Sequence, residues 1–196
     1  MGLRPLMVAA REVFSNLDIP WALVGGLAVG VRAAPRFTRD VDVAVSVAGD
    51  AAVEKVVFAF VSRGWRTGAV LEHGPTHRLA TVRLLPPGGD EGTPLLDCLF
   101  SSCGIEPDIA SQAEVLEILP GLSLPVARTG HLLAMKVLAM EDRSRPQDRD
   151  DIRALLEHAG QVDRDLATTA LGHIVTLGYH RGRDLHRIWV ELIRDS

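Results

Sequence analysis

The stretch that decides the fold of this chain begins with Trp21-Ala22-Leu23-Val24-Gly25-Gly26 and continues, after thirteen intervening residues, with Asp40-Val41-Asp42. Its four apolar residues predict a short buried strand, and the two glycines predict that the strand breaks and a helix begins. Glycine allows a positive φ and lets a ligand approach the backbone closely. Because the first N–H groups of a helix attract anions, the stretch predicts a phosphate-binding turn at Gly25 and Gly26. Tight packing between strand and helix is the alternative role of the two glycines.

The second part of the stretch, from Asp40 to Val47, has a period of two residues and predicts a strand. Asp40 and Asp42 then lie on one face, and the intervening valines lie on the other. Two adjacent carboxylates repel each other unless a cation neutralises them or one of them binds a proton. We therefore predict a site for Mg²⁺ or Mn²⁺ at Asp40 and Asp42. The alternative is that Asp40 caps a turn while Asp42 faces solvent.

A third carboxylate, Asp97, interrupts the apolar run Leu95–Phe100, which predicts another short strand. Burying an ionised carboxylate without a partner is costly, so Asp97 needs a compensating group. A metal ion shared with Asp40 and Asp42 would provide one. The alternative is a carboxylate at the end of a strand that accepts backbone hydrogen bonds or faces water.

Together, the residues from Leu23 to Val29 and from Arg36 to Val43 resemble the polymerase-β-type nucleotidyltransferase superfamily, and more narrowly its AbiEii group. The resemblance implies an α+β fold, a minimal nucleotidyltransferase fold in which a mixed sheet is flanked by helices. It implies that Asp40 and Asp42 hold the metal, that Asp97 joins them and helps to activate the attacking hydroxyl, and that an NTP is the substrate. The lead-in to the acidic pair, with Thr38 and Arg39, is expected to contact the nucleotide.

A second group of residues, Lys136, Asp148 and Asp151, resembles the C-terminal pattern of the same family. Lys136 lies in a helix that is apolar nearly all round, so its ammonium either reaches out to water or points into the cleft. Because a compact ammonium suits phosphate, we expect Lys136 to contact the triphosphate and to be catalytic. Asp148 and Asp151 either complement a helix N-terminus or orient Lys136 or an arginine at the nucleotide site.

Three arginines, Arg32, Arg36 and Arg39, lie between the glycine pair and the acidic pair. We expect one or more of them to face a triphosphate or an RNA backbone. For Arg32, an ordinary surface position is the preferred interpretation.

The rest of the chain has the pattern of an α+β protein. Residues 1–127 are expected to form the catalytic core, and residues 128–196 a C-terminal helical subdomain. The elements expected outside the motifs are helices at Leu3–Leu17 and Ala51–Ser62, strands at Trp65–Leu71 and Arg78–Leu85 joined by a turn near His73–Pro75, weaker strands at 115–119 and 122–126, and helices from Thr129 onward.

Composition excludes several classes of protein. The net charge of −4 and the pI near 6.0 argue against a protein that coats nucleic acid nonspecifically. The longest uncharged stretch, Ile19–Val31, has 13 residues, which is too short to span a bilayer. We expect no membrane association, no secretion signal and a cytoplasmic bacterial enzyme. Cys98 and Cys103 make neither a disulfide framework nor a zinc site.

The acceptor of the nucleotidyl group is the open question. The family resemblance favours RNA, particularly the 3′ end of tRNA, as a toxin-like activity that requires a cognate antitoxin protein. A small molecule such as an antibiotic is the alternative within the same reaction class. A non-catalytic, antitoxin-like nucleotide-binding module is the alternative from another class. A basic edge of the cleft would favour RNA, and an acidic pocket would favour a cationic antibiotic.

Overall fold

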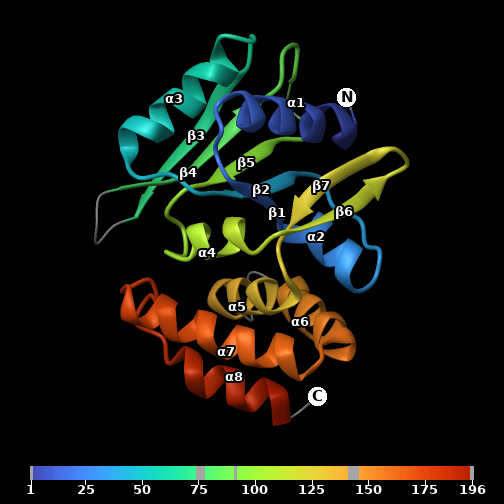
Figure 1. Ribbon diagram of the computed structural model, residues 1–196, viewed down its shortest axis with the longest axis vertical. Helices are drawn as coiled ribbons and strands as arrows, with labels where there is room; N and C mark the ends of the chain where they lie inside the picture. Colours follow the sequence, from blue (N-terminus) through green and yellow to red (C-terminus); the bar gives the residue numbers. More distant parts are fainter. Residues whose placement is uncertain (1, 74–77, 91, 141–145, 195–196) are drawn as a thin grey trace.

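The computed structural model describes residues 2–73, 78–90, 92–140 and 146–194, and its framework is a seven-stranded mixed sheet (Figure 1). The strands are β1 (Trp21–Val24), β2 (Val41–Val45), β3 (Arg66–His73), β4 (Arg78–Leu85), β5 (Leu96–Leu99), β6 (Glu114–Leu119) and β7 (Leu122–Val126). Their order across the sheet is β3-β4-β5-β2-β1-β7-β6. The pairs β1–β7 and β2–β5 are parallel, whereas β1–β2, β3–β4, β4–β5 and β6–β7 are antiparallel. The predicted mixed sheet of an α+β fold is therefore confirmed.

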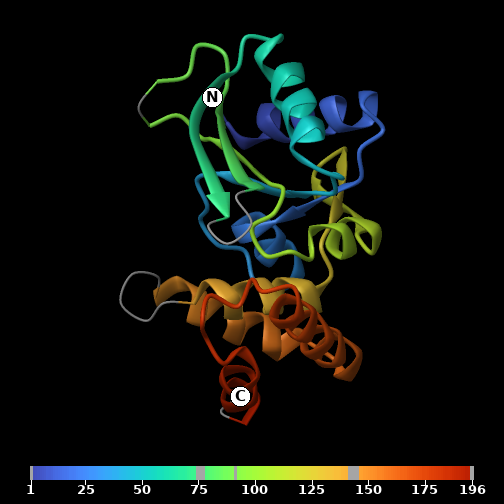
Figure 2. The same ribbon diagram turned by 90° about the vertical axis from the view of Figure 1, so that its left-hand side faces the viewer.

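Helices cover both faces of this sheet. On one face lie α1 (Leu3–Asn16) and α3 (Asp50–Val61), and on the other lie α2 (Gly25–Arg32) and α4 (Glu106–Ser111) (Figure 1). Beyond α2 and α4 the chain forms a separate layer of α5 (Thr129–Ala139), α6 (Pro146–His158), α7 (Gln161–Thr176) and α8 (Leu185–Arg194) (Figures 1 and 2). The chain passes from the sheet to this layer between β7 and α5, at the predicted boundary near residue 128. Whether the two parts also fold as separate domains stays a prediction.

The core between the sheet and the first helix pair contains an aromatic cluster. The ring of Phe14 on α1 lies 5.3 Å from that of Trp21 on β1 and 6.0 Å from that of Phe60 on α3, and Phe60 lies 5.2 Å from Trp65, all measured between ring centroids. Aromatic pairs at these distances stabilise a core beyond the area that they bury. The cluster fixes β1, and with β1 the point at which α2 begins.

The helix and strand pattern agrees with the sequence except in two places. The strand β2 is shorter than the predicted Asp40–Val47 and begins at Val41, so Asp40 precedes it. The short helix α4 was not predicted, because its few residues include Pro107 and show no helical periodicity. Part of the predicted turn near His73–Pro75 lies outside the described residues. Both cysteines are free and buried, and no helix in the described part of the chain combines the length and apolar character needed to cross a membrane.

Arg32, expected on the surface, instead joins three segments at the end of the sheet. Its side chain is 13% exposed. Its Nε donates a hydrogen bond to the carbonyl oxygen of Ala127 at 3.0 Å, and its Nη1 contacts Glu114 Oε2 at 2.6 Å. Because Ala127 follows β7 directly, these contacts fasten α2 to the strand that leads into the helical layer. The surface interpretation of Arg32 was therefore wrong.

Candidate active site

The turn at Gly25 and Gly26 has the conformation that the glycine pair predicted. The strand β1 ends at Val24 and α2 begins directly at Gly25, whose φ is +64°. A β-carbon added at Gly25 would lie 2.0 Å from Asp42 Oδ2, and one added at Gly26 would lie 2.8 Å from Thr38 Oγ1. A side chain at Gly25 would therefore displace Asp42, and one at Gly26 would displace the Arg36 and Thr38 side chains, because the start of α2 packs directly against the candidate site. No side chain caps the first N–H groups of α2, which leaves these donors available to an anion.

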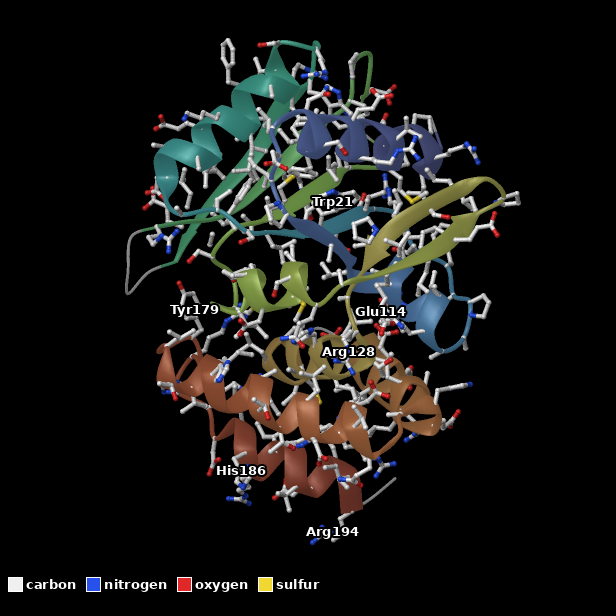
Figure 3. All side chains as sticks on the ribbon, in the orientation of Figure 1. Trp21, Glu114, Arg128, Tyr179, His186 and Arg194 are labelled. Atoms are coloured by element: carbon white, nitrogen blue, oxygen red, sulfur yellow. The ribbon has the colours of Figure 1, made fainter. Side chains whose placement is uncertain are left out.

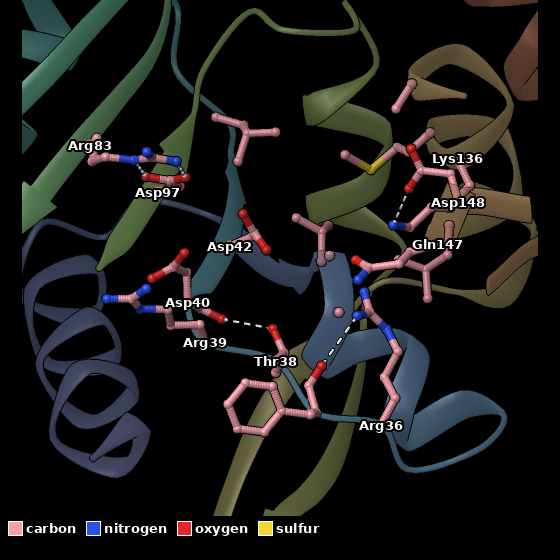
Figure 4. Close-up of a pocket in the computed structure, with 18 residues that line it drawn as sticks. Arg36, Thr38, Arg39, Asp40, Asp42, Arg83, Asp97, Lys136, Gln147 and Asp148 are labelled. Carbon is pink, nitrogen blue, oxygen red and sulfur yellow. Dashed lines mark hydrogen bonds and ion pairs between the residues drawn. The ribbon is translucent and has the colours of Figure 1, made fainter. Parts of the chain in front are cut away.

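The sheet brings the three predicted carboxylates to neighbouring positions. Asp42 on β2 is the register partner of Asp97 on the parallel strand β5. Asp40 lies two residues before Asp42, and its Oδ1 accepts a hydrogen bond from the backbone N–H of Leu95 at 2.9 Å. Asp40, Asp42 and Asp97 line one cleft of about 650 Å³ together with Gly25 and its neighbours (Figure 4). The backbone contact of Asp40 positions its carboxylate beside Asp42 at the edge of the sheet.

Asp42 is the electrostatic centre of the cleft. Burial, together with the negative charges of Asp97 and Asp40, raises the pKa of Asp42 to about 6, against the opposing effects of Lys136 and Arg83. A carboxylate in such surroundings is stabilised either by a proton or by a cation. Asp42 therefore lies where added positive charge is most favourable.

Asp97 already has a cationic partner in this structure. The Arg83 guanidinium on β4 binds it with two parallel contacts, Nε to Oδ1 at 2.8 Å and Nη2 to Oδ2 at 2.6 Å (Figure 4). Asp97 is 8% exposed, so this two-pronged ion pair compensates for the cost of burying it. Arg83 could not be predicted as a partner of Asp97 from the sequence, since only the pairing of β4 with β5 brings the two residues together.

On the opposite wall, Lys136 of α5 is held by two acidic residues of α6. Its Nζ lies 2.7 Å from Asp148 Oδ1 and 2.7 Å from Asp151 Oδ2. The guanidinium of Arg36 contacts Asp151 as well, with Nε 2.8 Å from Oδ1. The two carboxylates are 4% and 3% exposed, so each of them is buried with a cation. Of the two roles left open for Asp148 and Asp151, the structure shows that they orient Lys136 and Arg36, and Asp148 also lies in the first turn of α6.

The remaining residues of the lead-in lie at the mouth of the cleft. Thr38 and Arg39 both line it. Thr38 Oγ1 donates a long hydrogen bond of 3.4 Å to the carbonyl oxygen of Asp40, and Figure 4 shows Arg39 beside Asp40. Gln147, which begins the described side chains of α6, also lines the cleft and was not predicted. The cleft thus combines acids from the sheet with cations from the loop before β2 and from the helical layer.

The donor set suits a hard divalent cation. Asp40 and Asp42 offer carboxylate oxygens side by side, and oxygen is the ligand that Mg²⁺ prefers. Within the described ranges, no three acidic, histidine or cysteine side chains already converge as a metal cluster. Asp97 in particular is engaged by Arg83. Asp40 and Asp42 therefore fit such an ion as a pair, with Asp97 adjacent.

The mixed sheet, the helix that begins at the glycine pair and the paired carboxylates are the features that the resemblance to a nucleotidyltransferase predicted. The sequence profile of the family described as "Nucleotidyl transferase AbiEii toxin, Type IV TA system" matches residues 7–191. The chain therefore belongs to the AbiEii nucleotidyltransferase family, as the resemblance of its motifs predicted. Membership of this family implies a nucleotide substrate and a cognate antitoxin.

Solved structures show the same fold. One is the crystal structure of an antigenic nucleotidyltransferase-like protein from Paracoccidioides brasiliensis, with 22% identity and a TM-score of 0.51, covering 94% of this chain and 89% of that chain. Another is the solution structure of the antibiotic-resistance factor ANT(2'')-Ia, with 13% identity and a TM-score of 0.56, covering 90% of this chain and 97% of that chain. No curated protein sequence matches this chain. At these identities the structural likeness concerns the fold alone.

Proposed function

We propose that this nucleotidyltransferase transfers an NMP from an NTP to a hydroxyl group of RNA, with the 3′ end of tRNA as acceptor, in a reaction that depends on Mg²⁺ or Mn²⁺. The observation that carries the proposal is the placement of Asp40 and Asp42 against the uncapped start of α2, within one cleft. Carboxylates at this point suit a cation, and the N–H groups of α2 suit phosphate.

The triphosphate would lie between the glycine turn and Lys136. An ammonium group has three donor hydrogens, and two of those of Lys136 face Asp148 and Asp151. The third is then available to a phosphate oxygen without breaking either ion pair. Gly25 and Gly26 allow the backbone to approach the phosphates closely. Positioning of this kind is a large part of catalysis in phosphoryl transfer.

Asp40 and Asp42 would hold the metal, which when bound neutralises charge on the attacking and leaving oxygens. Burial and the neighbouring carboxylates raise the pKa of Asp42, so a cation and a proton compete for this carboxylate. Asp97 would act next to them on the acceptor side, where its ion pair with Arg83 holds it in place.

The reaction exchanges a phosphoanhydride bond of the NTP for a phosphoester bond to the acceptor. The acceptor hydroxyl oxygen forms a bond to the α-phosphorus, and the bond between that phosphorus and the oxygen bridging to the β-phosphate breaks. Pyrophosphate leaves, and the hydroxyl proton passes to Asp97 or to water. The NMP remains attached to the acceptor, so the modified RNA is one nucleotide longer.

Family membership supports the choice of acceptor and partner. In a toxin–antitoxin pair, capping the 3′ end of tRNA would stop translation, and the antitoxin would relieve the arrest. Because NTPs and tRNA meet in the cytoplasm, the proposal places the reaction there. A small molecule is the second candidate acceptor, since ANT(2'')-Ia, an antibiotic-resistance factor, has a similar fold.

The test is to incubate the protein with Mg²⁺, each α-labelled NTP in turn and total bacterial RNA. Asp42→Asn removes the charge at the centre of the cleft, and Asp165→Asn is the matched control because Asp165 lies exposed on α7. We expect label in a tRNA-sized band with the unaltered protein and with Asp165→Asn, but not with Asp42→Asn. Parallel reactions contain tobramycin in place of RNA, because ANT(2'')-Ia has been solved in complex with adenylyl-2''-tobramycin. Label that enters only tobramycin would support the second candidate. Nucleotide binding without transfer to any acceptor would contradict both and favour a non-catalytic module.

A further inference from the structure

A second cavity, of about 760 Å³, adjoins the candidate nucleotide cleft. The two share six lining residues, among them Asp42, Asp97 and Arg83, but the second cavity extends over β3 and β4. Since the strand order is β3-β4-β5-β2-β1, it lies on the side of the carboxylates away from the glycine turn on β1. In an in-line transfer the attacking and leaving oxygens lie on opposite sides of the phosphorus. If the triphosphate occupies the glycine side, the acceptor enters from the second cavity.

The chemistry of this cavity suits a nucleotide better than a polycation. Apart from the shared Asp42 and Asp97, none of its described lining residues is acidic. Its basic residues are Arg83, which is paired with Asp97, and Arg181. Arg181 makes no hydrogen bond or ion pair with the described residues, so its charge is uncompensated there. Leucine and methionine side chains, including Leu71 and Met135, supply apolar surface for a base.

Arg181 occupies a backbone position that is unusual for arginine. The N–H of Arg183 donates to the carbonyl oxygen of His180 at 2.9 Å, which closes a tight turn. Both central residues have positive φ, 55° at Arg181 and 70° at Gly182. Turns of this kind favour glycine, asparagine or aspartate at these positions. An arginine held in such a conformation is a reason to ask what its side chain does.

The turn is fastened on both sides, to the sheet half before it and to α5 after it. Before it, the hydroxyl of Tyr179 shares a short hydrogen bond with Ser101 Oγ, next to β5. After it, Arg183 Nη1 donates to the carbonyl oxygens of Val137 at 3.2 Å and Leu138 at 2.9 Å. Figure 3 shows Tyr179 at the junction between α4 and the helical layer. These contacts hold the turn, with Arg181, at the wall of the second cavity.

We propose that the second cavity is the acceptor subsite and that Arg181 determines acceptor specificity by binding a backbone phosphate near the 3′ end of an RNA. This inference rests on the proposed function and assigns its acceptor side to particular residues. The terminal nucleoside lies on the apolar surface near Leu71 and Met135, with its hydroxyl toward Asp97. An arginine with no competing carboxylate selects a phosphodiester acceptor and disfavours a cationic one.

The first experiment measures binding, so it does not depend on turnover. Arg181→Asn removes the charge but suits positive φ, and Arg11→Asn is the control because Arg11 lies exposed on α1, on the opposite face of the sheet. Fluorescence anisotropy would follow a labelled single-stranded RNA 12-mer with a free 3′ hydroxyl over a range of KCl concentrations. We expect Arg181→Asn to weaken binding about 5- to 10-fold and to reduce the salt slope by about 0.7, as for the loss of one phosphate contact. Arg11→Asn should change neither.

A second arm tests the phosphate directly. Neutral methylphosphonate linkages replace, one at a time, the three linkages nearest the 3′ end. At one of these linkages the substitution should weaken binding by the unaltered protein about 5- to 10-fold, as expected for the loss of one phosphate contact. The same substitution should not weaken binding by Arg181→Asn any further. Additive losses at every linkage would overturn the inference, as would equal binding by Arg181→Asn and Arg11→Asn or no RNA binding by the unaltered protein.

Parallel labelling reactions separate this inference from the proposed function. Transfer to RNA that is unaffected by Arg181→Asn refutes the role of Arg181 and leaves the function intact. RNA binding that depends on Arg181 without any transfer refutes the function and leaves the phosphate site intact. Binding of Mg²⁺ with α,β-methylene NTPs should be the same for Arg181→Asn and the unaltered protein, because Arg181 does not line the nucleotide cleft.

Discussion

Replacing Gly25 by alanine tests the contact at the centre of the cleft. Gly25 has a φ of +64°, a left-handed conformation that costs a residue with a side chain about 1–2 kcal/mol. The added β-carbon would also lie 2.0 Å from Asp42 Oδ2, so Asp42 has to move. We expect a total loss of about 2–4 kcal/mol in the free energy of unfolding. For a chain of this length, that loss lowers Tm by about 5–15 °C.

The displacement of Asp42 should also be visible in activity. A shift of about 1 Å in a positioning group can cost about 100-fold in rate, so we expect transfer of labelled NMP by Gly25→Ala to fall at least that far. The assay pairs differential scanning calorimetry of the metal-free protein with the labelling reaction at saturating NTP. Loss of activity at an unchanged Tm would mean that Asp42 yields at little energetic cost, and the predicted strain would then be wrong.

Gly30 provides the matched control within the same helix. It lies inside α2, and an added β-carbon would be 3.8 Å from its nearest neighbours, which is ordinary contact. Alanine is preferred to glycine in a helix interior by about 0.5–1 kcal/mol, so Gly30→Ala should raise Tm by a few degrees and preserve transfer. If Gly25→Ala and Gly30→Ala behave alike in both measurements, the reasoning from the φ angle and the Asp42 contact is refuted.

Substitutions at three further positions probe the charges of the cleft. The pKa of Asp42 is about 6 in the folded protein, above its ordinary value of 3.8, so ionisation of Asp42 destabilises the metal-free fold, increasingly between these two pH values and fully above pH 6. Asp42→Asn should therefore raise Tm at pH 7.5, and the gain should shrink as the pH falls below 6. A gain independent of pH would contradict this linkage. Arg83→Met frees Asp97 and removes a positive charge, so we expect Mn²⁺ to bind more tightly than to the unaltered protein, as measured by isothermal titration calorimetry. Weaker binding would show that the Arg83 contact is needed to hold Asp97 in place. Lys136→Ala leaves Asp148 buried without its cation and should lower the free energy of unfolding by about 3–5 kcal/mol, measured by thermal unfolding. Lys136→Arg is the control, because it keeps the charge. An unchanged Tm for Lys136→Ala would show that the ion pair does not stabilise the fold.

The parts of the site that could be predicted from the sequence are those encoded within a few residues. The end of β1 at Val24 and the start of α2 at Gly25 follow from an apolar run and a glycine pair. The common face of Asp40 and Asp42 follows from the period of a strand. These features depend on local backbone conformation, and both carboxylates line the cleft, although β2 begins at Val41 and Asp40 lies just before it.

The parts that could not be predicted depend on contacts between distant segments. Arg83 meets Asp97 only because β4 and β5 pair in one particular register, and the loop that joins these strands does not encode that register. Arg36 meets Asp151 across 115 positions of the chain. The position of Arg32 was predicted wrongly for the same reason, since the carbonyl oxygen that accepts a hydrogen bond from its Nε belongs to Ala127, directly after β7. In each case the tertiary structure alone brings the arginine and its partner together, and no local sequence pattern marks the pair.

The network around Lys136 shows that the nucleotide cleft belongs to both halves of the chain. Asp148 and Asp151 are almost fully buried, and buried carboxylates of this kind persist only with cations beside them. Lys136 comes from α5, but Arg36 comes from the loop before β2, so the sheet half supplies one of the two cations that these acids contact. Separating the halves at residue 128 would therefore leave Asp151 without Arg36 and remove the wall that faces the glycine turn. The helical layer thus forms one wall of the candidate active site, and its buried charges are balanced only when it is assembled on the sheet.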